Sequence, residues 1–161
     1  MRRKIYPVAI TISLPLVFLV FYIINQGHFE VQTCSSINPE LVKKNNILFI
    51  GCDVKWMGFG QPKIHQVNLI NEDNGTNNNE IDITPSIENQ PLTGLAVFTE
   101  EEASRSGLNE RLVPVRDYKV NNSFRLIIKI EYEDEKVFES FKTLSIRYNT
   151  FGIIREQQIR L

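Results

Sequence analysis

The sequence predicts a mainly β protein, with one β domain attached to a single transmembrane helix. Two observations carry this prediction: a run of twenty uncharged, mainly apolar residues near the N-terminus, and alternation of apolar and polar residues from Phe124 onward. Such alternation is the pattern of strands with one buried face. A length of 161 residues leaves room for one domain beside the helix, since domains run to about 100–200 residues. An α+β arrangement is the alternative.

The apolar segment 5–24 predicts the transmembrane helix. Residues 1–4 contain three basic side chains, and no charged residue then appears before Glu30. Twenty helical residues span about 30 Å, the thickness of a hydrocarbon core. Basic flanks remain cytoplasmic, so residues 1–4 are expected to be a cytoplasmic tail and the C-terminal part to be extracytoplasmic. The sequence therefore predicts a single-pass protein of the cell membrane, in contact with the lipid bilayer through residues 5–24.

A cleaved leader is the alternative to a retained anchor. Secretory signals have an apolar region of about 7–15 residues followed by a cleavage site with small residues. Here the apolar run is longer, and residues 24–28 (Ile-Asn-Gln-Gly-His) offer no such site. A lipoprotein signal would need its cysteine directly after the apolar run, whereas Cys34 follows a polar stretch. We therefore expect a retained signal anchor.

The charge balance argues against nucleic acid as a partner. Lys and Arg number 18 and Asp and Glu 19, a net charge of −1. Without Arg2, Arg3 and Lys4, 15 basic and 19 acidic residues remain, which makes the exported part about −4. The expected partner, apart from the bilayer, is another protein of the cell envelope.

The chain after the anchor divides into a stalk over residues 25–46 and an extracytoplasmic domain over residues 47–161. Within the stalk, Asn38 before Pro39 predicts the start of a short helix. The first half of the domain is expected to contain two strands, a polar surface loop and a brief edge strand ended by Pro85, at residues 47–52, 64–71, 72–80 and 81–84 respectively.

A strand over residues 95–98 is followed by the signature of a helix start. Thr99 with Glu102 three residues later forms a capping-box pattern, and Gly107 is a natural helix end. Glu100, Glu101 and Glu102 could alternatively form a metal or acid–base cluster, but a solvated first turn of a helix is the simpler interpretation.

The last forty residues predict three long antiparallel strands. Residues 124–132 alternate strictly except at Ile127, and residues 137–148 and 153–161 follow after turns. Such strands have one face in solvent and need a second layer to cover the other face. With the shorter strands upstream, the economical solution is a two-sheet immunoglobulin-like β-sandwich with one short helix.

No catalytic, cofactor or metal motif stands out. His28 and His65 belong to no metal-binding pair, and neither a nucleophile elbow nor a glycine-rich phosphate loop occurs. We therefore expect a membrane-anchored binding or accessory protein rather than an enzyme, without catalytic, cofactor or metal residues. The alternatives are an exported enzyme that uses carboxylates, and a subunit of a membrane complex that acts through its helix.

Two small groups of residues are candidates for a role. Trp56, Met57 and Phe59 lie next to Gly58 and Gly60 and would anchor a partner if exposed, although burial in the core is the commoner fate of such residues. Cys34 and Cys52 would close a loop of about 18 residues if they pair outside the cytoplasm, but spacing alone leaves the pairing open.

Overall fold

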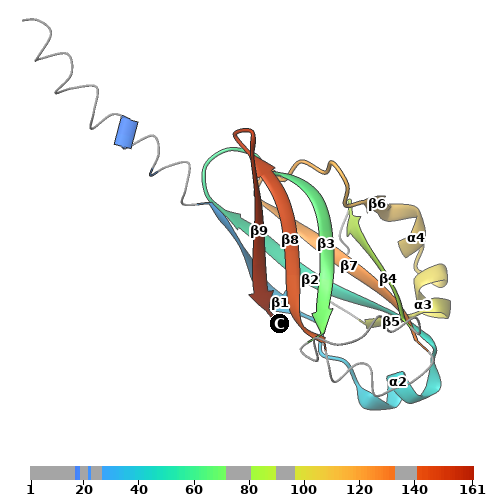
Figure 1. Ribbon diagram of the computed structural model, residues 1–161. Coiled ribbons are helices and arrows are strands. Elements are labelled where there is room, and N and C mark those ends of the chain that lie inside the picture. The colour runs from blue at the N-terminus through green and yellow to red at the C-terminus, as the bar shows by residue number, and fades with distance from the viewer. Residues whose placement is uncertain (1–16, 19–21, 23–26, 72–80, 90–96, 133–140) are drawn as a thin grey trace, which may run out of the picture.

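The computed structural model describes residues 17–18, 22, 27–71, 81–89, 97–132 and 141–161. From residue 27 onward the described chain folds as two packed antiparallel sheets with three short helices (Figure 1). The mainly β class and the two-sheet sandwich are thus confirmed.

The larger sheet has six strands in the order β1-β2-β7-β4-β6, with β5 paired to β2. These strands are β1 (His28–Cys34), β2 (Ile47–Met57), β4 (Ile81–Glu88), β5 (Val97–Thr99), β6 (Leu112–Pro114) and β7 (Ser123–Tyr132). The smaller sheet has the order β3-β8-β9, and its strands are β3 (Lys63–Asn71), β8 (Phe141–Thr150) and β9 (Ile153–Arg160).

The core lies between the two sheets and is built by residues of alternate parity. In β2 and β7 the inward set pairs across the ladder, as Leu48 with Ile130 and Ile50 with Ile128, and all four are buried. Inward residues of β3 and β8, including Ile64 and Ile146, close the core from the other sheet.

The outer face of the larger sheet is partly covered by two helices, α3 (Glu100–Arg105) and α4 (Leu108–Arg111). Phe49 and Ile127 pack there against Ala103 and Leu108 in a second apolar cluster. This cover explains why Ile127 breaks the alternation of β7, because the central strand is buried on both faces.

Of the three C-terminal strands expected to be antiparallel, only the last two pair with each other. β8 and β9 form a hairpin from Thr143 opposite Arg160 to Thr150 opposite Ile153, as expected. β7 instead lies between β2 and β4 in the other sheet. Alternation specifies that a strand has two unlike faces but does not say which neighbour it pairs with.

The stalk expected over residues 25–46 is also wrong, because its described residues belong to the domain. β1 pairs with β2 from His28 opposite Met57 to Cys34 opposite Cys52. The helix α2 (Pro39–Lys44) begins at Asn38, as expected, and Tyr132 fastens it by donating its hydroxyl to the Val42 carbonyl at 2.9 Å. β1 has polar outward side chains because it is an edge strand, which made it resemble a linker.

The expectation of a single helix is wrong too, although its local signals are confirmed. Thr99 and Glu102 form a reciprocal capping box, and Gly107 follows with φ +65°, the left-handed conformation typical of a helix end. The chain then enters α4 at once. The strand expected to stop at Pro85 continues as β4 to Glu88, because β6 pairs with β4 only from Ser86, so Pro85 lies where β4 has one neighbour.

Most of residues 5–24 and all of the loop 72–80 lie outside the described residues. Within the described part of the chain, no helix is long and apolar enough to cross a membrane.

Candidate functional site

An aromatic cluster fills the core at the end of the sandwich where β1 begins. The ring of Phe29 lies 5.0 Å from that of Trp56 and 4.9 Å from that of Tyr148, centroid to centroid. Trp56 and Tyr148 are 5.5 Å apart, and all three contacts are tilted or edge-on, as aromatic pairs prefer. Trp56 is 4% exposed, so of the two fates weighed for it, the structure shows burial in the core and not exposure to a partner.

The chain enters the domain directly on this cluster. Tyr148 donates its hydroxyl to the carbonyl of Gly27 at 3.1 Å. A Cβ on Gly27 would lie 2.2 Å from the Trp56 ring, and a Cβ on Gly58 would lie 2.5 Å from the Cα of Gly27. Only glycine permits backbones to approach so closely, so residue 27 is held beside the β2–β3 loop.

Burial of Tyr148 shifts the pKa of its hydroxyl. Burial raises the pKa of Tyr148 above its ordinary value of 10, and Arg155 on the neighbouring strand opposes the shift only in part. The hydroxyl therefore stays protonated over the whole neutral range, as its bond to Gly27 requires.

At the end of the sandwich that holds the aromatic cluster, several residues carry exposed apolar side chains. We call this group the apolar tip; it consists of Met57, Phe59, Phe151, Ile153 and Ile154. Phe59 is 63% exposed and Phe151 56% exposed. The two loops that carry them touch, since a Cβ on Gly60 would lie 2.8 Å from the Phe151 ring. Of the candidate residues from the sequence, Met57 and Phe59 are thus accessible for binding, whereas Trp56 is buried.

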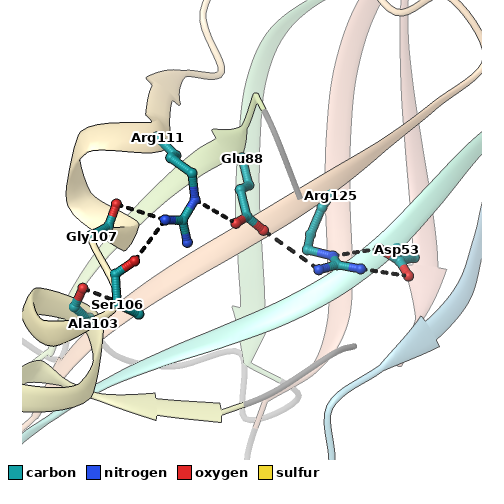
Figure 2. A network of polar contacts seen from close by, with 7 residues as sticks. All are labelled: Asp53, Glu88, Ala103, Ser106, Gly107, Arg111 and Arg125. Carbon is teal, nitrogen blue, oxygen red and sulfur yellow. Dashed lines mark hydrogen bonds and ion pairs between the residues drawn. The ribbon is translucent and has the colours of Figure 1, made fainter. Parts of the chain in front are cut away.

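A second group, shown in Figure 2, is a chain of charges on the outer face of the larger sheet. Arg125 of β7 donates to Asp53 of β2 at 2.8 Å, and its other end lies 3.6 Å from Glu88 of β4. Glu88 accepts from Arg111 of α4 at 3.2 Å. Arg111 also donates to the carbonyls of Ser106 and Gly107, at 2.8 and 3.0 Å.

This network fastens α4 to the sheet. Glu88 is 5% exposed, and its carboxylate lies between two guanidinium groups. The two guanidinium groups balance the charge of this buried carboxylate, and together they close it off from a substrate. The carboxylates of Asp53 and Glu88 lie on either side of the Arg125 guanidinium, and both pair with it. Their role in this arrangement is structural.

Cys34 and Cys52 are joined as a disulfide across the β1–β2 pair, the pairing that the spacing left open. Beside the disulfide lies a cavity of about 280 Å³ with mainly apolar walls, to which Ile50, Ile128 and Leu161 contribute. This volume is just below the range of roughly 300–1,000 Å³ that small-molecule sites occupy.

The other polar candidates are surface contacts. His65 lies 3.7 Å and Lys63 3.0 Å from the carboxylate of Asp117. The hydrogen bond from Lys63 lowers the pKa of Asp117 below its usual value. Glu102 is occupied in capping α3. No group of three or more His, Cys, Asp or Glu side chains that could hold a metal occurs among the residues that the structure describes.

Three of the five residues of the apolar tip, and all of the charge network, are not predicted by the sequence. Phe151, Ile153 and Ile154 were assigned to a turn and a strand, and the network joins residues from four separate elements. One signal was available for the tip, because residues 56–62 and 148–154 contain no charged side chain in a chain that is 23% charged.

Comparison of the chain with protein-family models, with curated proteins and with solved structures gives no significant match.

Proposed function

We propose that this protein is a single-pass membrane protein whose β-sandwich lies outside the cytoplasm and acts as a binding or accessory domain for another envelope protein. The apolar segment 5–24 behind a basic N-terminus supports the anchor. The described residues of that segment, Val17, Phe18 and Tyr22, are between 60% and 65% exposed. Apolar helical side chains that no protein group covers are suited to a lipid environment.

The observation that carries the proposal is the disulfide between Cys34 and Cys52. Disulfides persist in oxidising compartments and are rare in the cytosol. The basic residues before the apolar segment independently favour the other side of the membrane for the N-terminus. Two unrelated physical arguments thus support the same orientation for the sandwich.

The strand order supports an immunoglobulin-like domain. Taking β1, β2, β7 and β4 as strands A, B, E and D, and β3, β8 and β9 as C, F and G, reproduces the two sheets of a constant-type domain. The disulfide differs, since antibody domains link B to F across the core whereas Cys34 and Cys52 link the equivalents of A and B. This likeness concerns the scaffold and assigns no ligand.

The pairing of three carboxylates favours a structural role for them over a catalytic one. Asp53 and Glu88 both pair with Arg125, and Asp117 pairs with Lys63. A general acid or base must have its carboxylate within hydrogen-bond reach of a substrate, and these groups are engaged within the domain.

The orientation is tested with the full chain in a bacterial host. In cells whose outer layers are opened but whose inner membrane is intact, added protease should degrade the sandwich. The two cysteines should resist a maleimide until a reductant is added. A protected domain with freely labelled cysteines would contradict the proposal. The mass of the purified chain separates a retained anchor from a cleaved leader.

The accessory role is tested by cross-linking in the native membrane. We expect the sandwich to capture the same envelope protein when residues 5–24 are replaced by an unrelated apolar span of equal length. Loss of that partner in the chimera, with normal surface display, would favour a membrane-complex subunit that acts through its helix. A chain that stays monomeric in both forms would contradict the binding role.

A further inference from the structure

We infer that the apolar tip is seated in the extracytoplasmic lipid interface of the membrane that holds residues 5–24. The folded domain would then contact the bilayer a second time and be held at a set orientation. The inference rests on the proposed anchor and adds to it a lipid contact made by the sandwich itself.

The position of the tip follows from the length of chain between anchor and domain. Only residues 25 and 26 separate Ile24 from Gly27, and three residue steps span at most about 11 Å. Gly27 is held against Trp56 and Gly58, next to Met57 and Phe59. In Figure 1 the start of β1 and the β8–β9 turn share one end of the sandwich, and α2 lies at the other. The tip is therefore at the end of the domain that the apolar segment enters.

The chemistry of this end suits a lipid interface. Two of the segments that form it, residues 56–62 and 148–154, carry no charged side chain, and a third, residues 115–122, carries Arg116, Asp117 and Lys119. The helix α2 at the opposite end carries Glu40, Lys43 and Lys44. Aromatic and aliphatic side chains without charge partition into the interface, whereas charged groups resist it.

The backbone at Phe151 gives an independent argument. Phe151 and Gly152 form a two-residue turn with φ of +53° and +83°, so both residues are left-handed. Turns of this kind favour Asn followed by Gly, and an aromatic residue there is uncommon because its Cβ crowds the backbone. The ring packs on the backbone of Gly60 but is still 56% exposed, and insertion into lipid would cover the part that this contact leaves open.

The size of the tip favours lipid over a protein surface. A stable protein interface uses about 20–30 residues on each side, and the tip offers five side chains from two turns and the strand ends beside them. A bilayer interface needs only a few apolar side chains once an anchor has removed the entropic cost of association.

The test uses the full chain in phosphatidylcholine vesicles with and without bromine on the acyl chains, where bromine quenches nearby tryptophan. Phe59→Trp adds a probe at the tip, and Lys44→Trp adds a matched probe at the opposite end. The unsubstituted chain, with Trp56 alone, gives the background. We expect brominated lipid to quench the added emission of F59W at least twofold and to leave that of K44W unchanged.

Failure of the inference and failure of the anchor are distinguishable. Flotation of the vesicles in alkaline carbonate reports whether residues 5–24 are inserted. If the protein floats but the F59W emission is unquenched, the tip is not in lipid and the anchor stands. A protein partner as the true occupant would produce this result. If the protein does not float, both proposals are overturned.

A second variant separates lipid contact from folding. Phe151→Asn together with Ile153→Thr removes apolar surface while giving the turn its preferred residue. In the F59W chain we expect this pair to reduce quenching by at least half, with an unchanged or higher melting temperature. Undiminished quenching, or a fall in melting temperature that accompanies the loss, would show that these side chains serve the fold and not the membrane.

Discussion

The side-chain amide of Gln157 bonds both backbone groups of Phe29. The Phe29 N–H donates to Oε1 of Gln157 at 2.6 Å, and Nε2 of Gln157 donates to the Phe29 carbonyl at 2.7 Å. In the described sheets β1 and β9 are edge strands, one in each sheet. The amide thus takes the place of a missing strand partner and closes one side of the sandwich.

Replacement of Gln157 should be costly for this reason. Gln157→Ala leaves a half-buried N–H and C=O of Phe29 without partners, and we expect a loss of about 1–3 kcal/mol in the free energy of unfolding. Gln157→Glu keeps an acceptor for the Phe29 N–H but loses the donor to the Phe29 carbonyl. Its stability should therefore lie between that of the parent and that of Gln157→Ala. Urea unfolding of the domain measures both, with the exposed neighbour variant Gln158→Ala as control. Equal stabilities for Q157A and Q158A would contradict the role of the amide.

The buried charge network predicts a strong asymmetry between two acidic residues. Glu88→Ala leaves Arg111 and Arg125 close together without their shared carboxylate, and removal of one partner from a buried ion pair costs about 3–5 kcal/mol. Glu101 makes a solvated pair with Arg105, so Glu101→Ala should change the melting temperature little. Calorimetry of the two variants decides the matter, and a small effect of E88A would mean that α4 is held by its apolar contacts alone.

The disulfide should stabilise the domain to a degree set by its loop. Cys34 and Cys52 are 18 residues apart, and closing a loop of that size is worth roughly 3 kcal/mol by chain entropy. We expect a reductant to lower the melting temperature of the unsubstituted domain. The double variant C34S/C52S should melt at the temperature of the reduced parent, and the reductant should not change its melting temperature. A melting temperature that does not respond to reduction in the unsubstituted protein would contradict this contribution.

Tyr148 predicts a loss of stability at alkaline pH. Burial raises the pKa of its hydroxyl in the folded state, so its contribution is fully present below the unfolded pKa of about 10 and is lost as the pH rises through the folded pKa. The difference in free energy of unfolding between the parent and Tyr148→Phe should be constant from pH 7 to about 9.5 and narrow above it. Chemical unfolding at a series of pH values measures this difference. If the parent and Tyr148→Phe differ in free energy of unfolding by the same amount at pH 11 as at pH 8, burial does not raise the pKa of Tyr148.

Local sequence was sufficient wherever short-range chemistry decides structure. The alternation of Phe124, Leu126, Ile128 and Ile130 predicts β7 correctly because side chains of a strand alternate between faces. Thr99 with Glu102 predicts the start of α3, since the cap needs only groups three residues apart. The two-sheet sandwich follows from such strands, because each needs a second layer over its apolar face.

Only the tertiary structure decided which strands are neighbours and which side chains meet. The partner of β7, the inclusion of β1 in the sheet and the burial of Trp56 all depend on contacts between distant parts of the chain. Phe59 and Phe151 become one surface only because β3 and β8 pair in register and bring their connecting loops to the same end. Pairing energies of this kind arise from packing against a particular neighbour, so no local period or spacing records them.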